Sequence, residues 1–582
     1  MYLVLAQKHT MENFLNKKEA RTFSWIYLGE NVTNAIRIEK EKPNWTRISI
    51  ANLLQETAKK IANEYVEYIS GITKKKDISW WASRISEKNP FISKAFLHLC
   101  YLKVAAELIT NGEEMIFFVE DMDVFESIKT NFGKMMTVNI TIIDRITGMC
   151  SLIKKFIINK IWFFISNIQQ EIISKKLIGN RINNHEKYTI MHTFVNKNSF
   201  DNNGNFKETY FGEMPNWLSS HGKQVVILIR VLDSVAYKTI ANKLAKNNNI
   251  LLWNRYITVY DLLKVFIDNV LQFPKIKRYH FENLEISSII INDELNDWIE
   301  NRRCSDMLLY YGIKNMKKNG IHISEFVHTY ENHAWEKISI CALRKFYPET
   351  KIIGYQHAAF SNMQLNYFFT KKDLETMYLP DKIITSGKYY QDIFSEAGYP
   401  KKMLVMGGSF RFSYLLTQRK KPGNANGILV TFTLDENQAT ELYHEVFEAF
   451  KDENTEVILK FHPFASPKKV INAISTEIPK NFNLNNNKIS ELFEKCNVLI
   501  YTTSTTCIEA IAAGIVPIHL ESNHFIDMDQ LAEYPEARLV AKNSMELIMS
   551  IKKTKEIDTN KMEIVKERFS EINKEKIIAL FE

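Results

Sequence analysis

Hydroxyl side chains crowd one segment near the end of the sequence. The segment VLIYTTSTTCIEAIAAGIVP places Thr502–Thr506 between an expected strand and an expected helix, with Glu509 in the first turn of that helix. The start of a helix offers unpaired backbone N–H groups and a partial positive charge, which favour phosphate. We therefore predict that Thr503, Ser504 and Thr505 bind a nucleotide and that Glu509 accepts hydrogen bonds from a ribose. Helix capping is the alternative explanation, but one cap needs only one such residue.

Two further segments follow expected strands in the same part of the chain. The segment EVILKFHPF places Lys460, His462 and Pro463 at the end of a strand, and VMGGSFR places Arg411 just after another. Ligands of parallel sheets bind beyond the carboxyl ends of the strands. Lys460, His462 and Pro463 are therefore candidates for a ligand site, and Arg411 could pair with a phosphate.

A second group of titratable side chains follows strands in the middle of the chain. The segment FVHTYENHAWEK contains Glu331, and KIIGYQHAAF contains His357. A titratable group at a strand's carboxyl end can act as a general base on a hydroxyl. We predict His357 as the base, with Glu331 as a second candidate. The alternatives are a buried structural histidine and a helix-start acid favoured by the helix dipole.

Other motifs have plainer explanations. Asp121 and Asp123 have the bare DxD spacing after a strand, but a cluster at a helix start explains them as well. Trp80 and Trp81 could stack on a sugar, although paired tryptophans more often belong to a core. No metal site and no cofactor are predicted.

Short β-branched runs alternate with longer helical patterns along the whole chain, which is typical of parallel sheets with crossover helices. The expected class is α/β, with two Rossmann-like domains. The N-terminal domain spans 1–375 and the C-terminal nucleotide-binding domain spans 376–558. A charged helix is expected over 559–582.

An amphipathic insertion is expected at about 147–180 within the N-terminal domain. Five lysines interrupt apolar and aromatic clusters there, which is the profile of a helix lying in a membrane interface. Packing of this helix on its own domain is the alternative. No stretch approaches the length of about 18 apolar residues that a membrane span needs, and the N-terminus reads as a strand instead of a signal peptide.

The composition excludes several classes of protein. Of 582 residues, 45% are apolar and 24% are charged, so the chain is neither disordered nor disulfide-dense. The net charge of +8 is small for a chain of this length and predicts no nucleic-acid partner. Six cysteines without a CxxC pair indicate reduced thiols in a cytoplasmic protein.

Together these motifs resemble a known family. The segments WWASRISEKNPF, YENHAWEK, GYQHA, KFHP and TTST look like those of bacterial surface-carbohydrate (O-antigen-type) biosynthesis proteins. The C-terminal half is also similar to the GT-B group that includes CDP-glycerol glycerophosphotransferases and transferases of CMP-activated Kdo or sialic acids. In those glycerophosphotransferases the residue after the proposed histidine is glycine, whereas here it is Ala358.

The resemblance implies a GT-B-like, inverting, metal-independent glycosyltransferase whose two domains face each other across a cleft. Its partners would be a nucleotide-sugar donor, with a CMP-activated acidic sugar preferred, and a glycan or lipid-linked glycan acceptor of lipopolysaccharide biosynthesis. A peripheral contact with the inner face of the cytoplasmic membrane is also expected. An NDP-sugar 2-epimerase and a non-catalytic scaffold of polysaccharide assembly are the alternative functions.

Overall fold

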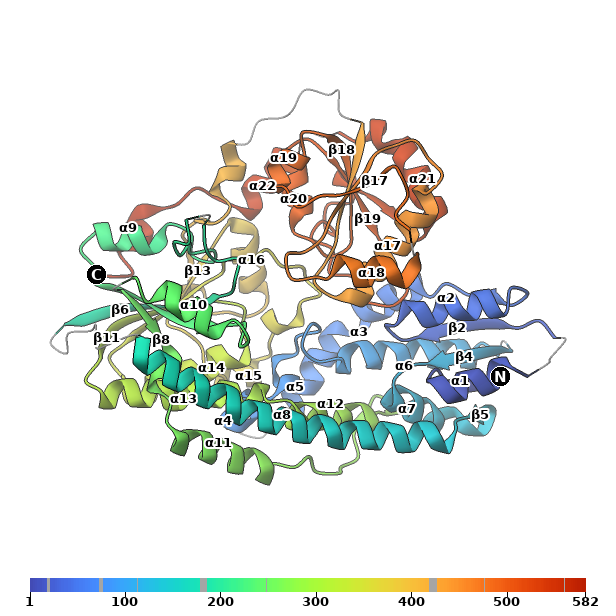
Figure 1. Ribbon diagram of the computed structural model, residues 1–582, viewed down its shortest axis with the longest axis horizontal. Coiled ribbons are helices and arrows are strands. Elements are labelled where there is room, and N and C mark those ends of the chain that lie inside the picture. The colour runs from blue at the N-terminus through green and yellow to red at the C-terminus, as the bar shows by residue number, and fades with distance from the viewer. Residues whose placement is uncertain are drawn as a thin grey trace.

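Three parallel sheets follow one another along the chain (Figure 1). The computed structural model describes residues 1–17, 21–72, 77–112, 114–177, 186–201, 203–247, 249–417, 426–475, 477–558 and 561–582. The α/β class with parallel sheets is confirmed. The seven-stranded and six-stranded sheets are the two predicted Rossmann-like units, and a five-stranded sheet precedes them. We call these the first, second and third units in chain order.

The first unit has the strand order β3-β2-β4-β1-β5. Its central strands are runs of apolar residues because helices cover both faces; every residue of β4 is buried. This sheet corrects the predicted single unit over 1–375, whose strands the structure divides between two sheets. The elements of this unit are β1 (Tyr2–Leu5), α1 (Lys8–Leu15), β2 (Ser24–Leu28), α2 (Val32–Glu41), β3 (Thr46–Arg47), α3 (Ala51–Ile72), α4 (Ile78–Trp81), α5 (Arg84–Glu87), α6 (Ala95–Thr110), β4 (Met115–Val119), α7 (Met122–Phe132) and β5 (Thr137–Asn139).

One long helix, α8 (Ile142–Leu177), connects the first unit to the second and runs along the lower edge of the molecule in Figure 1. Its first turn is anchored by Asp144, whose carboxylate accepts hydrogen bonds from the backbone and hydroxyl of Thr10. Lys160 faces inward and donates to Asn269 and to the carbonyl of Trp298. The predicted insertion is therefore a bridge between sheets; its end at 178–180 lies outside the described residues.

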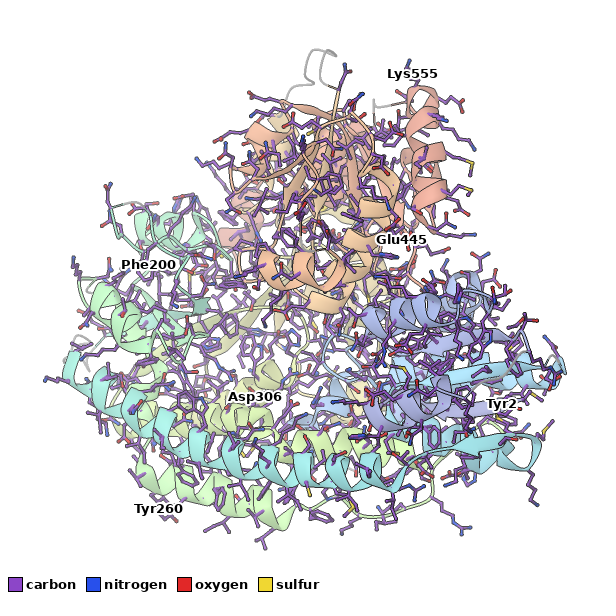
Figure 2. The ribbon with its side chains drawn as sticks, turned by 45° about the vertical axis from the view of Figure 1, so that its right-hand side comes forward. Tyr2, Phe200, Tyr260, Asp306, Glu445 and Lys555 are labelled. Atoms are coloured by element: carbon purple, nitrogen blue, oxygen red, sulfur yellow. The ribbon has the colours of Figure 1, made fainter. Side chains whose placement is uncertain are left out.

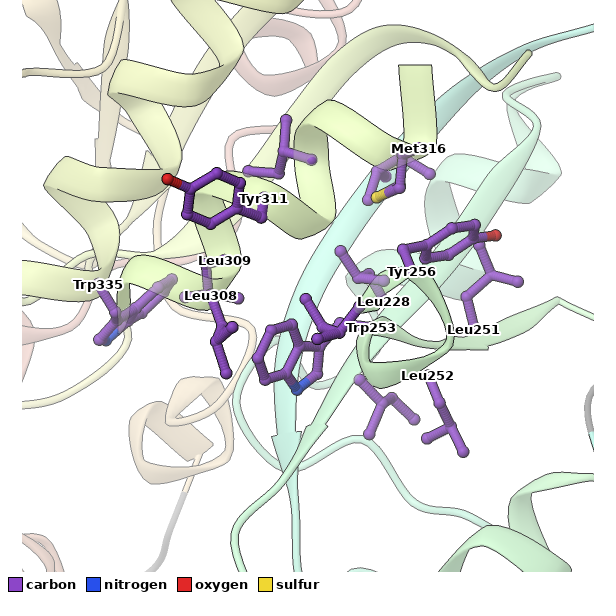
Figure 3. Close-up of a cluster of buried hydrophobic side chains, with 14 of the residues drawn as sticks. Leu228, Leu251, Leu252, Trp253, Tyr256, Leu308, Leu309, Tyr311, Met316 and Trp335 are labelled. Carbon is purple, nitrogen blue, oxygen red and sulfur yellow. The ribbon is translucent and has the colours of Figure 1, made fainter. Parts of the chain in front are cut away.

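The second unit has the strand order β14-β13-β12-β11-β6-β7-β8. Figure 3 shows part of its core, where Trp253 and Tyr256 lie close to Leu228 of β7 and to Leu251 and Leu252 of β8. Along the chain, the elements after α8 and up to the last strand of this sheet are β6 (Lys187–Val195), α9 (Met214–Ser220), β7 (Val225–Val231), α10 (Tyr237–Leu244), β8 (Ile250–Leu252), α11 (Val259–Leu271), β9 (His280–Phe281), β10 (Leu284–Glu285), α12 (Ser287–Ile299), α13 (Arg302–Lys318), β11 (His322–Thr329), α14 (Ala334–Phe346), β12 (Lys351–Tyr355), α15 (Lys371–Thr376), β13 (Lys382–Thr385), α16 (Lys388–Glu396) and β14 (Leu404–Met406).

Two of these strands correct the predicted division at residue 375. The sequence placed 382–385 and 404–406 in the C-terminal domain, but β13 pairs with β12 and β14 pairs with β13 in the second sheet. Conversely, the hairpin β9–β10 and helix α12 lie on the first unit, where Phe281, Ile286 and Ile290 join its core. Which strand pairs with which depends on long-range contacts, and a local sequence pattern does not predict them.

The third unit has the strand order β17-β16-β15-β18-β19-β20. Its elements are β15 (Gly427–Thr431), α17 (Glu436–Phe450), β16 (Val457–Lys460), α18 (Pro467–Ile474), β17 (Phe482–Leu484), α19 (Ile489–Leu492), β18 (Cys496–Tyr501), α20 (Thr506–Ala512), β19 (Val516–Leu520), β20 (Leu539–Ala541) and α21 (Ser544–Lys553).

The C-terminal tail returns to the second unit. The single helix expected over 559–582 is wrong: two short helices, α22 (Met562–Arg568) and α23 (Lys574–Ile578), are separated by extended chain, and 559–560 lie outside the described residues. The tail pairs with the backbone after β13 and β14, and Ile577 packs under the second sheet. In Figure 1 the C-terminus accordingly lies beside β6, far from the third sheet.

Candidate functional site

Glu331 and His357 lie side by side at the carboxyl edge of the second sheet. They follow neighbouring strands β11 and β12, whose last residues Thr329 and Tyr355 are paired in register. The Nε2 atom of His357 lies 3.8 Å from Oε1 of Glu331. The structure therefore brings the two predicted catalytic side chains together.

The loop that carries Glu331 is held in one conformation. The Glu336 carboxylate accepts hydrogen bonds of 2.9 Å from the backbone N–H groups of both Glu331 and Asn332. Asn332 has a φ of 57°, a left-handed conformation that non-glycine residues adopt at some cost, and its buried side chain donates to the carbonyl of Asn366. The segment YENHAWEK thus builds a rigid platform that presents Glu331.

His333 makes the third member of this group. Its Nε2 lies 2.8 Å from Oε2 of Glu331. Burial favours the neutral carboxyl of Glu331, but the hydrogen bond and charge of His333 outweigh it and hold the pKa of Glu331 at about 2. Burial lowers the pKa of His357 to about 4 despite the nearby charge of Glu331. At neutral pH the pair is a carboxylate beside a neutral imidazole.

A cavity of about 510 Å³ opens in front of this pair. Glu331 and His357 line it, and the Glu331 side chain is 31% exposed whereas His357 is only 4% exposed. The rest of the wall combines aromatic and polar groups from the second sheet, α13 and α8. These include Phe194, Tyr210, Arg230, Trp253, Arg302, Asp306 and Trp335, with Trp162, Asn167 and Gln170 from α8.

Arg411 lies between the second and third units. It follows β14, and its guanidinium charge affects groups of both units. Burial raises the pKa of Glu331 in the second unit and of Glu509 in the third, and the charge of Arg411 opposes this effect. Burial lowers the pKa of His357, and the charge of Arg411 lowers it further. Such shared influence requires that all of these groups lie within electrostatic reach of one cation. Arg411 therefore links the predicted catalytic pair to the predicted nucleotide motifs.

The two motifs of the third unit lie at one edge of its sheet. Thr431 at the end of β15 pairs with Lys460 on one side and with Tyr501 on the other. At the usual strand spacing, Lys460 and Tyr501 are about 10 Å apart. Helix α20 begins at Thr506 without a side-chain cap from Thr505, and the buried Thr502 hydroxyl has no partner among the described residues. Capping therefore accounts for Ser504, whose hydroxyl accepts a 3.2 Å hydrogen bond from the backbone N–H of Thr506, but not for the buried Thr502 hydroxyl.

Other predicted nucleotide-binding groups have partners within the chain. Lys460 donates to the carbonyl of Asn487, on the side of its strand away from β18. His462, whose pKa burial lowers, accepts a hydrogen bond from the backbone of Phe464, beyond Pro463. Glu509 accepts a 2.8 Å hydrogen bond from the hydroxyl of Tyr414. Lys460 is thus directed away from Thr503, Ser504 and Thr505, while Glu509 faces the connection between the units.

The glycines of VMGGSFR serve packing. A side chain on Gly407 or Gly408 would collide with Ile384 or with the backbone of Glu571. These glycines therefore allow the C-terminal tail to pack closely against the backbone after β14.

The remaining candidate motifs are structural in this arrangement. Asp121 and Asp123 flank opposite ring nitrogens of buried His98, at 3.3 and 2.6 Å. Trp81 is buried and donates its indole N–H to the carbonyl of Thr376. Asp121, Asp123 and Trp81 thus each have a partner within the chain, and the group of His98, Asp121 and Asp123 also has the donor atoms to hold a metal ion.

Sequence reasoning missed one residue that contacts the site from outside the second unit. Glu87 belongs to α5 of the first unit, and its carboxylate lies 3.1 Å from Nδ1 of His333. The only feature of the sequence that could have indicated Glu87 is its position in the segment WWASRISEKNPF, where it is an acidic residue within a buried turn.

Comparison with known proteins gives only distant likenesses. The sequence matches no protein-family model and no curated protein. Among solved structures, the calicheamicin glycosyltransferase CalG4 matches with a TM-score of 0.41 and 9% identity over 68% of this chain and 98% of its own. The UDP-GlcNAc 2-epimerase of Methanocaldococcus jannaschii, in complex with UDP-GlcNAc and UDP, gives 0.40 and 13% over 68% and 99%. MurG of Acinetobacter baumannii gives 0.36 and 10% over 66% and 95%.

Proposed function

We propose that this protein is an inverting, metal-independent glycosyltransferase that moves a sugar from a nucleotide to a glycan acceptor. The observation that carries the proposal is the Glu331–His357 pair, which faces a cavity and shares the charge of Arg411 with Glu509 of the third unit. A base at an acceptor cavity, joined by a cation to a hydroxyl-rich loop, suits transfer between a hydroxyl and a phosphate-linked sugar.

The acceptor belongs in the cavity of the second unit. The side chains of Phe194, Tyr210 and Trp162 are at least partly exposed in the cavity wall and offer stacking surfaces, and polar groups between them can bind hydroxyls. The acceptor hydroxyl would give its proton to the neutral imidazole of His357 as its oxygen attacks the anomeric carbon. Glu331, an anion at 3.8 Å, would stabilise the imidazolium that forms.

The donor belongs at the edge of the third sheet. Cleavage of the bond between the anomeric carbon and the phosphate oxygen leaves a nucleotide anion. We assign its charge to Arg411, His462 and the hydroxyls of Thr503, Ser504 and Thr505, with Glu509 on the ribose. Pro463 would border the same site, whereas Lys460 is directed toward Asn487 and away from the hydroxyls. A CMP-activated acidic sugar is the donor that the family resemblance favours.

Release of the nucleotide tests the proposal. We expect the protein to release CMP from a CMP-activated acidic sugar only when a lipid-linked or free glycan acceptor is present, and faster than it cleaves UDP or GDP sugars. Formation of an epimer from a UDP sugar without acceptor would instead identify an epimerase, and no preference for cytidine would contradict the donor assignment. Chromatography of nucleotide and sugar products distinguishes these results.

We further propose that α8 and α11 place the protein on a membrane surface. Among the described residues, none of the helices combines the length and apolar character needed to cross a bilayer. On α8, however, Ile158, Ile161 and Ile165 are each at least 45% exposed, and Lys154 and Lys155 are exposed beside them. Exposed apolar residues continue along α11 and the chain after it, at Tyr260, Leu263, Ile267, Leu271, Phe273 and Ile276.

This surface lies next to the acceptor cavity. In Figure 2, Tyr260 lies at the lower rim of the molecule, whereas Asp306, in the cavity wall, lies above α8. Trp162 of α8 is 50% exposed and also lines the cavity. A helix with apolar residues and lysines can rest in an anionic interface, where each basic residue contributes about 1 kcal/mol. A lipid-linked acceptor could then reach the cavity from the bilayer.

Vesicle flotation tests the membrane contact. Replacing Ile161 and Ile165 by aspartate should lower binding to vesicles that contain anionic phospholipid about tenfold or more, because two apolar side chains leave the interface and two repelled charges enter it. Met545, 71% exposed on α21, provides the control M545D, which should float like the wild type. If the wild type, the double aspartate variant and M545D all float to the same extent, or all fail to float, this part of the proposal is wrong.

A further inference from the structure

Glu87 is a buried acid that reaches the second unit from the first. It is the last residue of α5, and its side chain has no exposed surface. A carboxylate buried to this extent is costly unless other groups compensate its charge. Its partners therefore indicate what it does.

The partners of Glu87 all belong to the second unit. Oε1 accepts a 2.6 Å hydrogen bond from the backbone N–H of Ala334 and a 2.5 Å bond from the guanidinium of Arg302. Oε2 lies 3.1 Å from Nδ1 of His333. Burial would raise the pKa of Glu87, but the charges of Arg302 and His333 outweigh it and hold the pKa at about 2. Glu87 is thus an anion aimed at the ring of His333.

His333 lies between two carboxylates. Its Nδ1 faces Glu87 and its Nε2 faces Glu331, at 3.1 and 2.8 Å. Burial disfavours the imidazolium, but the two anions more than compensate and raise the pKa of His333 to about 10. The charged or titratable groups around this ring are Glu87 and Arg302 on one side, and Glu331, Glu336, Lys337 and His357 on the other.

We propose that Glu87 is a positioning residue that fixes the orientation of Glu331 through His333. An imidazole holds one preferred tautomer or protonation state when both nitrogens have partners. With both nitrogens engaged, the ring of His333 cannot turn, and Glu331 keeps one oxygen for His333 and the other, at 3.8 Å, for His357. The first unit thereby completes the site of the second. The inference rests on the proposed function only where it concerns turnover.

The isosteric variant E87Q tests this chain of contacts. NMR titration of the His333 ring and of the Glu331 carboxyl measures it without any substrate. We expect the pKa of His333 to fall from about 10 toward its usual range near 6.5, because one of its two anions has gone. The pKa of Glu331 should stay low, because it titrates near 2, where the His333 ring is still an imidazolium. In the transfer assay we expect kcat to fall about 10- to 100-fold with little change in KM, as when a partner that orients a reactive group is lost.

The neighbouring residue supplies the matched control. Lys88, next to Glu87, pairs with Asp373 of the second unit at 2.6 Å, outside the His333 chain. The variant D373N should destabilise the same interface while leaving the pKa values of His333 and Glu331 unchanged. E87D, which restores an anion on a shorter side chain, should recover part of the raised pKa of His333.

Two results would overturn the inference: an unchanged pKa of His333 in E87Q, or a lowered pKa of His333 with kcat intact. If the wild type transfers no sugar at all, the proposed function fails, and the titration of His333 alone decides whether Glu87 fixes the state of that ring.

Discussion

Replacing His357 by glutamine should lower kcat for sugar transfer by about 10²- to 10⁴-fold, the usual contribution of a general base. Glutamine retains much of the shape of the ring but cannot accept the acceptor's proton at neutral pH. E331Q should lower kcat as well, since the imidazolium would lose the anion that lies 3.8 Å from Nε2. Nucleotide release at saturating donor measures both.

The pH dependence of the same reaction checks the assignment. His357 has a pKa lowered to about 4 and must be neutral to accept a proton, so kcat/KM should rise with pH through about 4 and then level off above pH 6. The control H322Q changes an exposed histidine at the opposite end of β11 and should transfer sugar like the wild type. EDTA should leave turnover intact; complete loss in EDTA, or an H357Q variant with normal kcat, would refute the mechanism.

Replacing Asp373 by asparagine should destabilise the protein by about 3–5 kcal/mol, the scale for breaking a buried ion pair by removing one partner. Lys88 and Asp373 lie 2.6 Å apart with side chains 4% and 1% exposed, so asparagine would leave the Lys88 ammonium buried without a counter-charge. Ser70 also donates to this carboxylate, at 2.5 Å. The midpoint of denaturant unfolding measures the effect. Hydrogen exchange in α3 and α5 reports whether the contacts of the first unit are lost.

An exposed ion pair provides the comparison. Arg21 and Glu114 pair on the surface with side chains 62% and 50% exposed, and E114Q should cost about 1 kcal/mol or less. The double variant K88M/D373L, which removes both buried charges, should recover much of the stability lost in D373N. Equal midpoints for D373N and E114Q would show that the pair does not hold the units together.

The sequence by itself determined most strands and the identity of the site motifs. The run MIFFV is apolar and buried throughout, and KIIGY is buried after its first residue, because strands between two helical layers bury both faces; this pattern is local. Glu331 and His357 could be singled out because a parallel sheet brings the ends of its strands to one edge. For the same reason the KFHP and TTST motifs could be expected on one side of the third sheet.

Only the tertiary structure decided how these parts combine. The strands at 382–406 joined the second sheet, the C-terminal tail folded back under it, and Lys460 turned away from the hydroxyl loop. Glu87 came to lie beside His333, 246 residues along the chain. The physical reason is the same in each case: pairing of strands and compensation of buried charges depend on which surfaces meet, and no local pattern of residues records that.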